Sequence, residues 1–109
     1  MAYDEGLAER IRTRLGDHPA VGEKRMFGGL AFLHEGNMAV GVIGDELVVR
    51  VGPDATGTAL ARPGARPFDF TGRPMRGWVV VAASAVAEDT DLDAWIDEGV
   101  AYAESLPPK

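Results

Sequence analysis

The region from Glu23 to Val51 constrains the fold most, because it consists of short apolar runs separated by turns that contain glycine. Such runs are too short for ordinary helices, and glycine permits the positive φ angles of tight hairpin turns. The pattern predicts an antiparallel meander with strands at 24–27, 30–34, 38–43 and 46–51. Glu35-Gly36-Asn37 and Gly44-Asp45 are predicted turns, and Gly28-Gly29 is predicted to be a third turn or a bulge.

The run at 46–51 alternates in a way that gives the predicted sheet two different faces. Leu47, Val49 and Val51 share one face, whereas Val48 and Arg50 point to the other. One face is therefore expected to pack against the core, and the other to meet solvent or a partner.

Helical spacing of apolar residues appears at both ends of the chain. Residues 3–15 predict a helix that ends at Gly16, a residue suited to a left-handed cap. A last helix is predicted from about Thr90, where 90–93 resembles a capping box. Its expected buried stripe is formed by Leu92, Trp95, Ile96, Val100 and Ala103.

The segment between the meander and the last helix is less regular. We expect a short helix at 53–60, then a proline-rich loop over 62–75 containing an edge strand at 68–70, and a strong strand at 78–82. The predicted fold class is α+β with two layers. It has an antiparallel sheet of about five to six strands with a meander core, and the N- and C-terminal helices pack largely on one face.

Length and composition favour one intracellular domain. The 109 residues contain no cysteine, so disulfides and cysteine-based metal sites are excluded. We expect a single domain over 1–109. The acidic N-terminus and the lack of a ~20-residue apolar run favour a cytoplasmic location and argue against a membrane partner.

The formal charge of −6 is distributed unevenly along the chain. Residues 24–76 hold seven basic and five acidic side chains (+2), whereas 77–109 hold one basic and seven acidic (−6). The overall acidity makes a nucleic-acid partner unlikely on charge grounds, since phosphate binding depends on Lys and Arg.

Several segments together resemble the TfoX/Sxy N-terminal domain family. They are Arg25-Met26-Phe27-Gly28-Gly29 with the following Leu30-Ala31-Phe32-Leu33, then Gly36-Asn37-Met38, the strand at 46–51, Pro67-Phe68, and the acidic-start helix with Trp95. The resemblance implies a two-layer α+β fold and a link to regulation of DNA-uptake competence, in which full-length members assist transcription with the cyclic-AMP receptor protein. Those members continue into a second, helical domain, so we expect a stand-alone copy.

The sequence offers no arrangement typical of catalysis. Neither Ser84 nor Ser105 lies in a Gly-x-Ser-x-Gly elbow, and the glycines match no phosphate-binding motif. His18 and His34 are predicted to be structural or solvated, with His34 beside Glu35 as the one hint of a metal site. The acidic residues around the last helix are interpreted as a solvated helix start, with an oxygen-ligated divalent ion as the alternative. We therefore expect no enzyme, no cofactor and no metal.

A set of basic residues carries the main functional hypothesis. Their strand positions are expected to align on one sheet face, and 72–78 adds two guanidinium groups beside Trp78. The alternative is that these charges only solubilise the surface by pairing with Asp69, Glu46 or the last helix. The candidate binding residues are Arg25, Phe27, Gly28, Gly29, Arg50, Arg73 and Arg76, with Lys24 and Arg66 beside them.

Three functions remain open from the sequence. The first is a non-enzymatic regulatory or protein-interaction module whose partner is another protein, docked on a sheet face or on an edge strand such as 68–70. The second is weak nucleic-acid binding by the basic face. The third is a binder of small anions, or an enzyme of unidentified type, that uses Arg50 or Arg76 in a pocket between sheet and helices. A homodimer through a sheet edge is also compatible with the sequence.

Overall fold

The computed structural model describes residues 3–108 except 17, 27, 70–71 and 73–74. The chain forms three α-helices, six strands and one 3₁₀ helix within these residues. In chain order the elements are α1 (Glu5–Leu15), β1 (Val21–Met26), β2 (Gly29–His34), β3 (Asn37–Ile43), β4 (Glu46–Arg50), α2 (Thr56–Leu60), β5 (Ala65–Pro67), β6 (Trp78–Val81), η1 (Ala83–Val86) and α3 (Asp89–Glu104).

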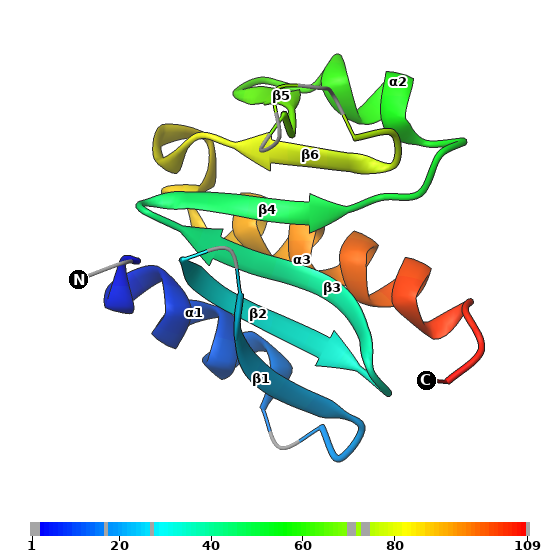
Figure 1. The fold of residues 1–109 in the computed structure, drawn as a ribbon. Coiled ribbons are helices and arrows are strands. Elements are labelled where there is room, and N and C mark those ends of the chain that lie inside the picture. Colours follow the sequence, from blue (N-terminus) through cyan, green and yellow to red (C-terminus); the bar gives the residue numbers. More distant parts are fainter. Residues whose placement is uncertain (1–2, 17, 27, 70–71, 73–74, 109) are drawn as a thin grey trace.

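The six strands form one antiparallel sheet in the order β1-β2-β3-β4-β6-β5. The first four strands are the predicted meander, because short turns place each strand beside the one before it. The helices α1 and α3 cover the same face of the sheet (Figure 1). The predicted two-layer α+β class is thereby confirmed.

Two apolar clusters lie on the two faces of the sheet. The helix-facing cluster includes Phe32, Leu47 and Val49, which pack with Ile11 of α1 and Ile96 of α3. On the opposite face, here called the open face, Ala31, Met38, Val48 and Val80 pack with Phe68. The predicted alternation of β4 is therefore correct, with Val48 on the face that carries no helix.

The helix ends have specific local causes. Asp4 caps α1, because its Oδ1 accepts the backbone N–H groups of Gly6 and Leu7. Gly16 ends α1 with φ 59°, as the sequence predicts. The predicted capping box at 90–93 is wrong: α3 begins at Asp89, and its N-cap, Glu88, makes no side-chain capping hydrogen bond.

Two other local predictions need correction. The strand expected at 68–70 lies at Ala65–Pro67 instead, because the carbonyl oxygen of Phe68 accepts from Met75 and the N–H of Trp78 donates to Met75, so the pairing with β6 does not continue; residue 70 lies outside the described residues. Within α3, Gly99 takes a buried place in the stripe where Val100 was expected, and Val100 is only half-buried. A Cβ atom on Gly99 would lie 2.5 Å from the carbonyl oxygen of Ala39, so α3 packs closely on β3 at this point.

Candidate functional site

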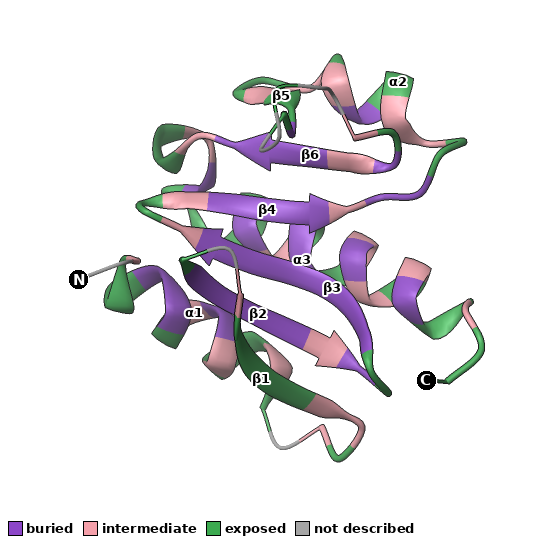
Figure 2. Ribbon diagram, in the orientation of Figure 1, coloured by how far each residue is buried: buried purple, intermediate pink, exposed green. Residues whose placement is uncertain are grey.

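Strand β1 is the outer strand at one edge of the sheet and the most exposed of the strands longer than three residues. Four of its six residues are exposed, whereas β2, β3, β4 and β6 consist mainly of buried residues (Figure 2). Within the described part of the chain, β1 pairs only with β2. One side of its backbone therefore faces solvent.

The hydrogen bonds at the start of β1 fix which backbone groups point outward. Glu35 donates its N–H to the carbonyl oxygen of Ala20 at 2.8 Å, and Val21 donates to His18 at 3.1 Å instead of to β2. Paired residues in an antiparallel ladder alternate between hydrogen-bonded and non-hydrogen-bonded pairs. The register Glu23↔Phe32 and Arg25↔Leu30 then directs the N–H and C=O groups of Glu23 and Arg25 away from β2.

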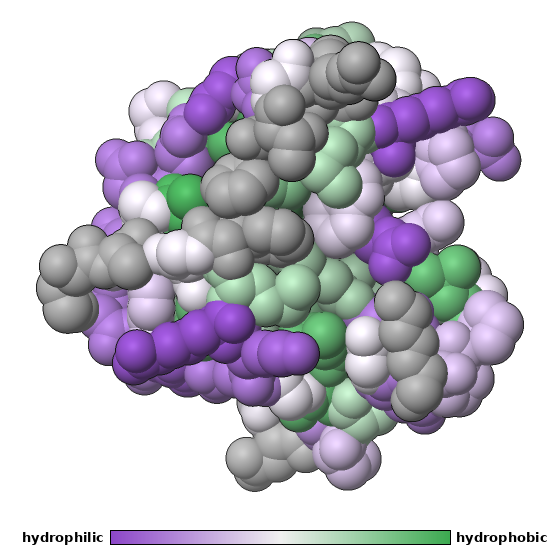
Figure 3. Space-filling view, viewed as in Figure 1, coloured by the Kyte–Doolittle hydropathy of each residue, from purple (hydrophilic) through white to green (hydrophobic). Residues whose placement is uncertain are grey.

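The side chains of β1 carry an unbalanced positive charge. Glu23 is held by Arg12 of α1 in a two-point contact at 2.8 Å and 2.8 Å, and this hydrogen bonding lowers the pKa of Glu23. Neither Lys24 nor Arg25 forms an ion pair with any residue that the structure describes. Hydrophilic side chains accordingly border the apolar middle of the open face (Figure 3).

The predicted alignment of Arg25 and Arg50 on one sheet face is wrong. Arg25 pairs with Leu30, which belongs to the helix-facing cluster, whereas Arg50 pairs with Trp78 of the open face. Side chains alternate along a strand, so the register places these two guanidinium groups on opposite faces.

Arg50 lies between two aromatic rings at the end of β4. Its guanidinium carbon is 5.2 Å from the centroid of Trp78 and 5.4 Å from that of Tyr102, distances typical of cation–π contacts. The sequence analysis missed Tyr102, because it lies on α3 and no local pattern connects it with β4. These contacts assign Arg50 a packing role.

The other candidates in the binding set are dispersed. Gly28 lies in the turn after β1 with φ 75°, and Gly29 begins β2, so the predicted turn is confirmed. Arg76 is exposed just before β6. Phe27 and Arg73 lie outside the described residues.

Several other cations pair with acids, as the alternative interpretation expects. Arg66 contacts Glu46 through both carboxylate oxygens, and the hydrogen bond lowers the pKa of Glu46. The acidic last helix is engaged in the same way. Its ion pairs are Arg10–Asp89, Arg14–Asp97 and Arg62–Glu98.

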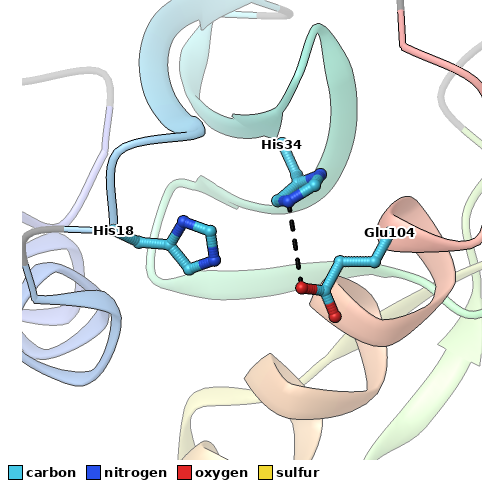
Figure 4. Close-up of side chains that lie close together, drawn as sticks. All are labelled: His18, His34 and Glu104. Carbon is cyan, nitrogen blue, oxygen red and sulfur yellow. Dashed lines mark ion pairs between the residues drawn. The ribbon is translucent and has the colours of Figure 1, made fainter.

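The two histidines lie together, which the sequence analysis did not foresee. Their ring centroids are 5.3 Å apart, and the carboxylate of Glu104 lies beside them (Figure 4). Glu35, the acid expected next to His34, is exposed and has a positive φ of 49°. The cluster joins three segments distant in the chain, so no spacing motif marks it.

The comparison with family models decides the classification. The model of the TfoX N-terminal domain matches residues 13–103, nearly the whole chain. This chain belongs to the TfoX N-terminal domain family. The match includes all six strands, α2 and most of α3, but only the last three residues of α1. Neither the comparison with curated proteins nor that with solved structures gave a match.

Family membership supports a competence- or regulator-like domain at the level of the family. Among the described residues, none of the helices has both the length and the apolar character needed to cross a membrane.

Proposed function

We propose that this TfoX N-terminal domain is a non-enzymatic, cytoplasmic regulatory module that binds an extended, acidic segment of another protein along β1. The observation that carries the proposal is the outer edge of β1, a six-residue strand with outward backbone groups and two cations that form no ion pair with a described residue. Membership in a family of regulator-type domains supports the regulatory part.

The backbone of β1 suits the addition of a further strand. An added strand gains main-chain hydrogen bonds from the exposed edge, and its alternate side chains then meet the side chains of β1. Lys24 lies on the open-face side and Arg25 on the helix side. Acidic residues on either side of the added strand would each meet a cation, which gives the interaction its charge preference.

A second copy of this chain fits the same edge less well. Antiparallel pairing of two β1 strands centred on Lys24 would place the two Lys24 side chains opposite one another, and Glu23, which would lie opposite Arg25 of the other copy, is already held by Arg12. Like charges opposite one another destabilise a strand pair. An acidic partner is therefore favoured over self-association.

Nucleic-acid binding is less well supported. Arg25 and Arg50 lie on opposite faces, and Arg66 is paired with Glu46. Among the described residues, the remaining cations do not form the continuous basic surface that binding to a phosphate backbone requires. The pocket expected between sheet and helices is also not supported, since large buried side chains fill that space.

The test compares affinity capture by the wild-type chain, the double variant Lys24→Glu/Arg25→Glu and the control Arg76→Glu. All three positions are exposed, so each variant should keep its stability within about 0.5 kcal/mol. We expect a protein that the wild type and Arg76→Glu retain and the double variant loses. Hydrogen exchange of the purified complex should then show slower exchange within residues 21–26.

Two outcomes would contradict the proposal. One is equal loss of the captured protein with Arg76→Glu, which would indicate diffuse charge attraction. The other is a complex in which residues 21–26 exchange as fast as in the free chain. Capture of nucleic acid that is lost steeply as salt increases would instead favour the second function.

A further inference from the structure

Three side chains from distant parts of the chain converge at one end of the molecule, on the helix side of the sheet. His18 lies in the loop after α1, His34 is the last residue of β2, and Glu104 is the last residue of α3. Each offers a potential ligand atom, and these atoms all lie within 4.8 Å of one another. Figure 4 shows the two rings and the carboxylate directed toward a common point.

The backbone holds each of these residues in place. The N–H of His18 donates to Leu15, and its carbonyl oxygen accepts from Val21. His34 is paired with both Val21 and Asn37. The loop after α1 and the end of β2 are therefore fixed relative to each other.

The end of α3 is fixed to the sheet by a separate contact. The buried Asn37 donates its Nδ2–H to the carbonyl oxygen of Pro107 at 2.9 Å, which ties the segment after α3 to the start of β3. The close packing of Gly99 on Ala39 holds the same helix against β3. Glu104 is thus brought to the histidines by the tertiary structure.

We propose that His18, His34 and Glu104 bind a divalent transition-metal ion of the Zn²⁺ type. Two imidazole nitrogens and one carboxylate oxygen are a donor set typical of such ions, whereas Ca²⁺ and Mg²⁺ prefer oxygen ligands alone. Three protein ligands leave the fourth tetrahedral position for water or an external ligand. This inference is independent of the proposed binding along β1.

Binding requires the three ligand atoms, which lie within 4.8 Å of one another, to move closer together. His34 Nε2 and Glu104 Oε2 are 3.8 Å apart, and ligand atoms around a tetrahedral Zn²⁺ ion are separated by about 3.3 Å, given its bond lengths. His34 is 9% exposed and positioned by the sheet. Glu104 has a side chain that is 51% exposed, so rotation of this side chain can close the site.

His18 has one ring nitrogen available for the ion. Its Nδ1 accepts the N–H of Ala20 at 3.3 Å, a long contact, and the other ring nitrogen faces Glu104 (Figure 4). Ligation through that nitrogen moves the ring proton to Nδ1 and gives up the contact with Ala20. The loss is small because the hydrogen bond is already long.

Access and local charge are both compatible with a cation. His18 and Glu104 line an open cleft of about 320 Å³ that Arg14 and Asp97 also border. Arg14 would repel a metal ion, but its guanidinium is engaged by Asp97 at 2.6 Å and lies 3.8 Å from Asp93. The acidic α3 therefore offsets the nearest positive charge.

The experiment uses the full chain without a histidine tag, freed of metal by a chelator and titrated with ZnCl₂. His18 and His34 are the only histidines, so two imidazole signals in NMR spectra report directly on the site. We expect both signals to shift and to saturate at one equivalent of Zn²⁺. Co²⁺ in place of Zn²⁺ should give the visible absorption of a low-symmetry site.

Matched substitutions locate the ligands. His18→Gln and Glu104→Gln should each weaken Zn²⁺ binding by at least about tenfold, because loss of a ligand exceeds the effect of losing a supporting hydrogen bond. Glu35→Gln serves as the control, since it changes the acid next to His34 in sequence but outside the cluster. It should bind Zn²⁺ as the wild type does.

The wild-type titration alone can overturn the proposal. If neither imidazole signal moves at one equivalent of Zn²⁺, the cluster is only an ion pair with a ring contact. Equal weakening by Glu35→Gln and Glu104→Gln would indicate unspecific binding to surface acids. Circular dichroism of each metal-free variant verifies folding, so that a loss of binding is not a loss of structure.

Discussion

The two edges of the sheet differ in how the chain protects them. Strand β5 has three residues and ends in Pro67, which has no N–H to offer to another strand. The next residue, Phe68, is buried over the open face, with its ring centroid 6.1 Å from that of Trp78. Strand β1 is twice as long, contains no proline, and three of its four exposed residues carry charge.

This difference shows which edge is available for binding. A short strand that ends in proline is a poor template for a further strand. A long edge strand that carries Lys and Arg can pair with a further strand, but its charge disfavours strands of like charge. Charge discourages pairing with an identical edge and still admits a partner of opposite charge. The length and the proline of β5 thus prevent strand addition at that edge, whereas at the β1 edge only charge limits which strands can be added.

Gly29→Ala should have the largest effect on stability, because it forces β2 away from β3 at the point where β2 leaves the turn from β1. A Cβ atom at this position would lie 2.0 Å from the carbonyl oxygen of Val42, a backbone atom in the neighbouring strand β3. We expect a loss of about 1–3 kcal/mol or more in the free energy of unfolding, measured with urea.

Gly22→Ala is the matched control on β1 itself. It lies in open space at an ordinary φ, so the added methyl group should be neutral or stabilise by up to about 1 kcal/mol. Equal destabilisation by the two substitutions would mean that β1 tolerates no side chain, and the steric explanation would then be incorrect.

Phe68→Ala should have the next largest effect and act on the opposite edge. Removal of this buried ring should cost about 1.5–3 kcal/mol, near the transfer free energy alone, because the loop around it can collapse into the space. Hydrogen exchange should become faster within 65–67 and stay unchanged within 21–26.

The neighbouring Asp69→Ala is the control for this change. Asp69 is exposed, so its substitution should alter stability by less than about 0.5 kcal/mol. Faster exchange at both edges in Phe68→Ala would show that Phe68 supports the whole sheet and does not specifically secure β5.

Features with local causes could be predicted from the sequence. The end of α1 follows from Gly16, and the meander follows from glycine-containing turns, since both depend on residues adjacent in the chain. The position of β5 could not be predicted, because the alternation at 68–70 resembles a strand and the contacts of Phe68 and Trp78 with Met75, which end the pairing at Pro67, depend on the tertiary structure.

The candidate site depended on information that local patterns lack. A shift of one residue in register moves a side chain to the other face, so the sequence did not determine that Arg25 and Arg50 lie on opposite sides. Glu104 meets His34 only because α3 packs on β3 at Gly99. Residues that tertiary packing brings together leave no spacing signal in a single sequence.

Ion pairs should contribute least, and about equally at the two edges. The pair Glu23–Arg12 lies at the β1 edge, and the pair Glu46–Arg66 lies near the β5 edge. In each pair, the guanidinium group contacts both carboxylate oxygens. These hydrogen bonds lower the pKa of each acid from 4.5. The side chains are 30–51% exposed, so Glu23→Gln and Glu46→Gln should each cost less than about 1 kcal/mol at pH 7.

The pH dependence tests whether this small contribution comes from ionisation. A lowered pKa in the folded state stabilises the chain above the unfolded pKa, and the contribution disappears as the pH falls through the folded value. The thermal unfolding of each variant and of the wild type should therefore differ at pH 7 and converge as the pH is lowered well below 4.5. If the difference in stability persists in acid, it comes from packing of the side chain and not from its charge. If one variant is clearly less stable than the other, ion pairing also distinguishes the β1 edge from the β5 edge.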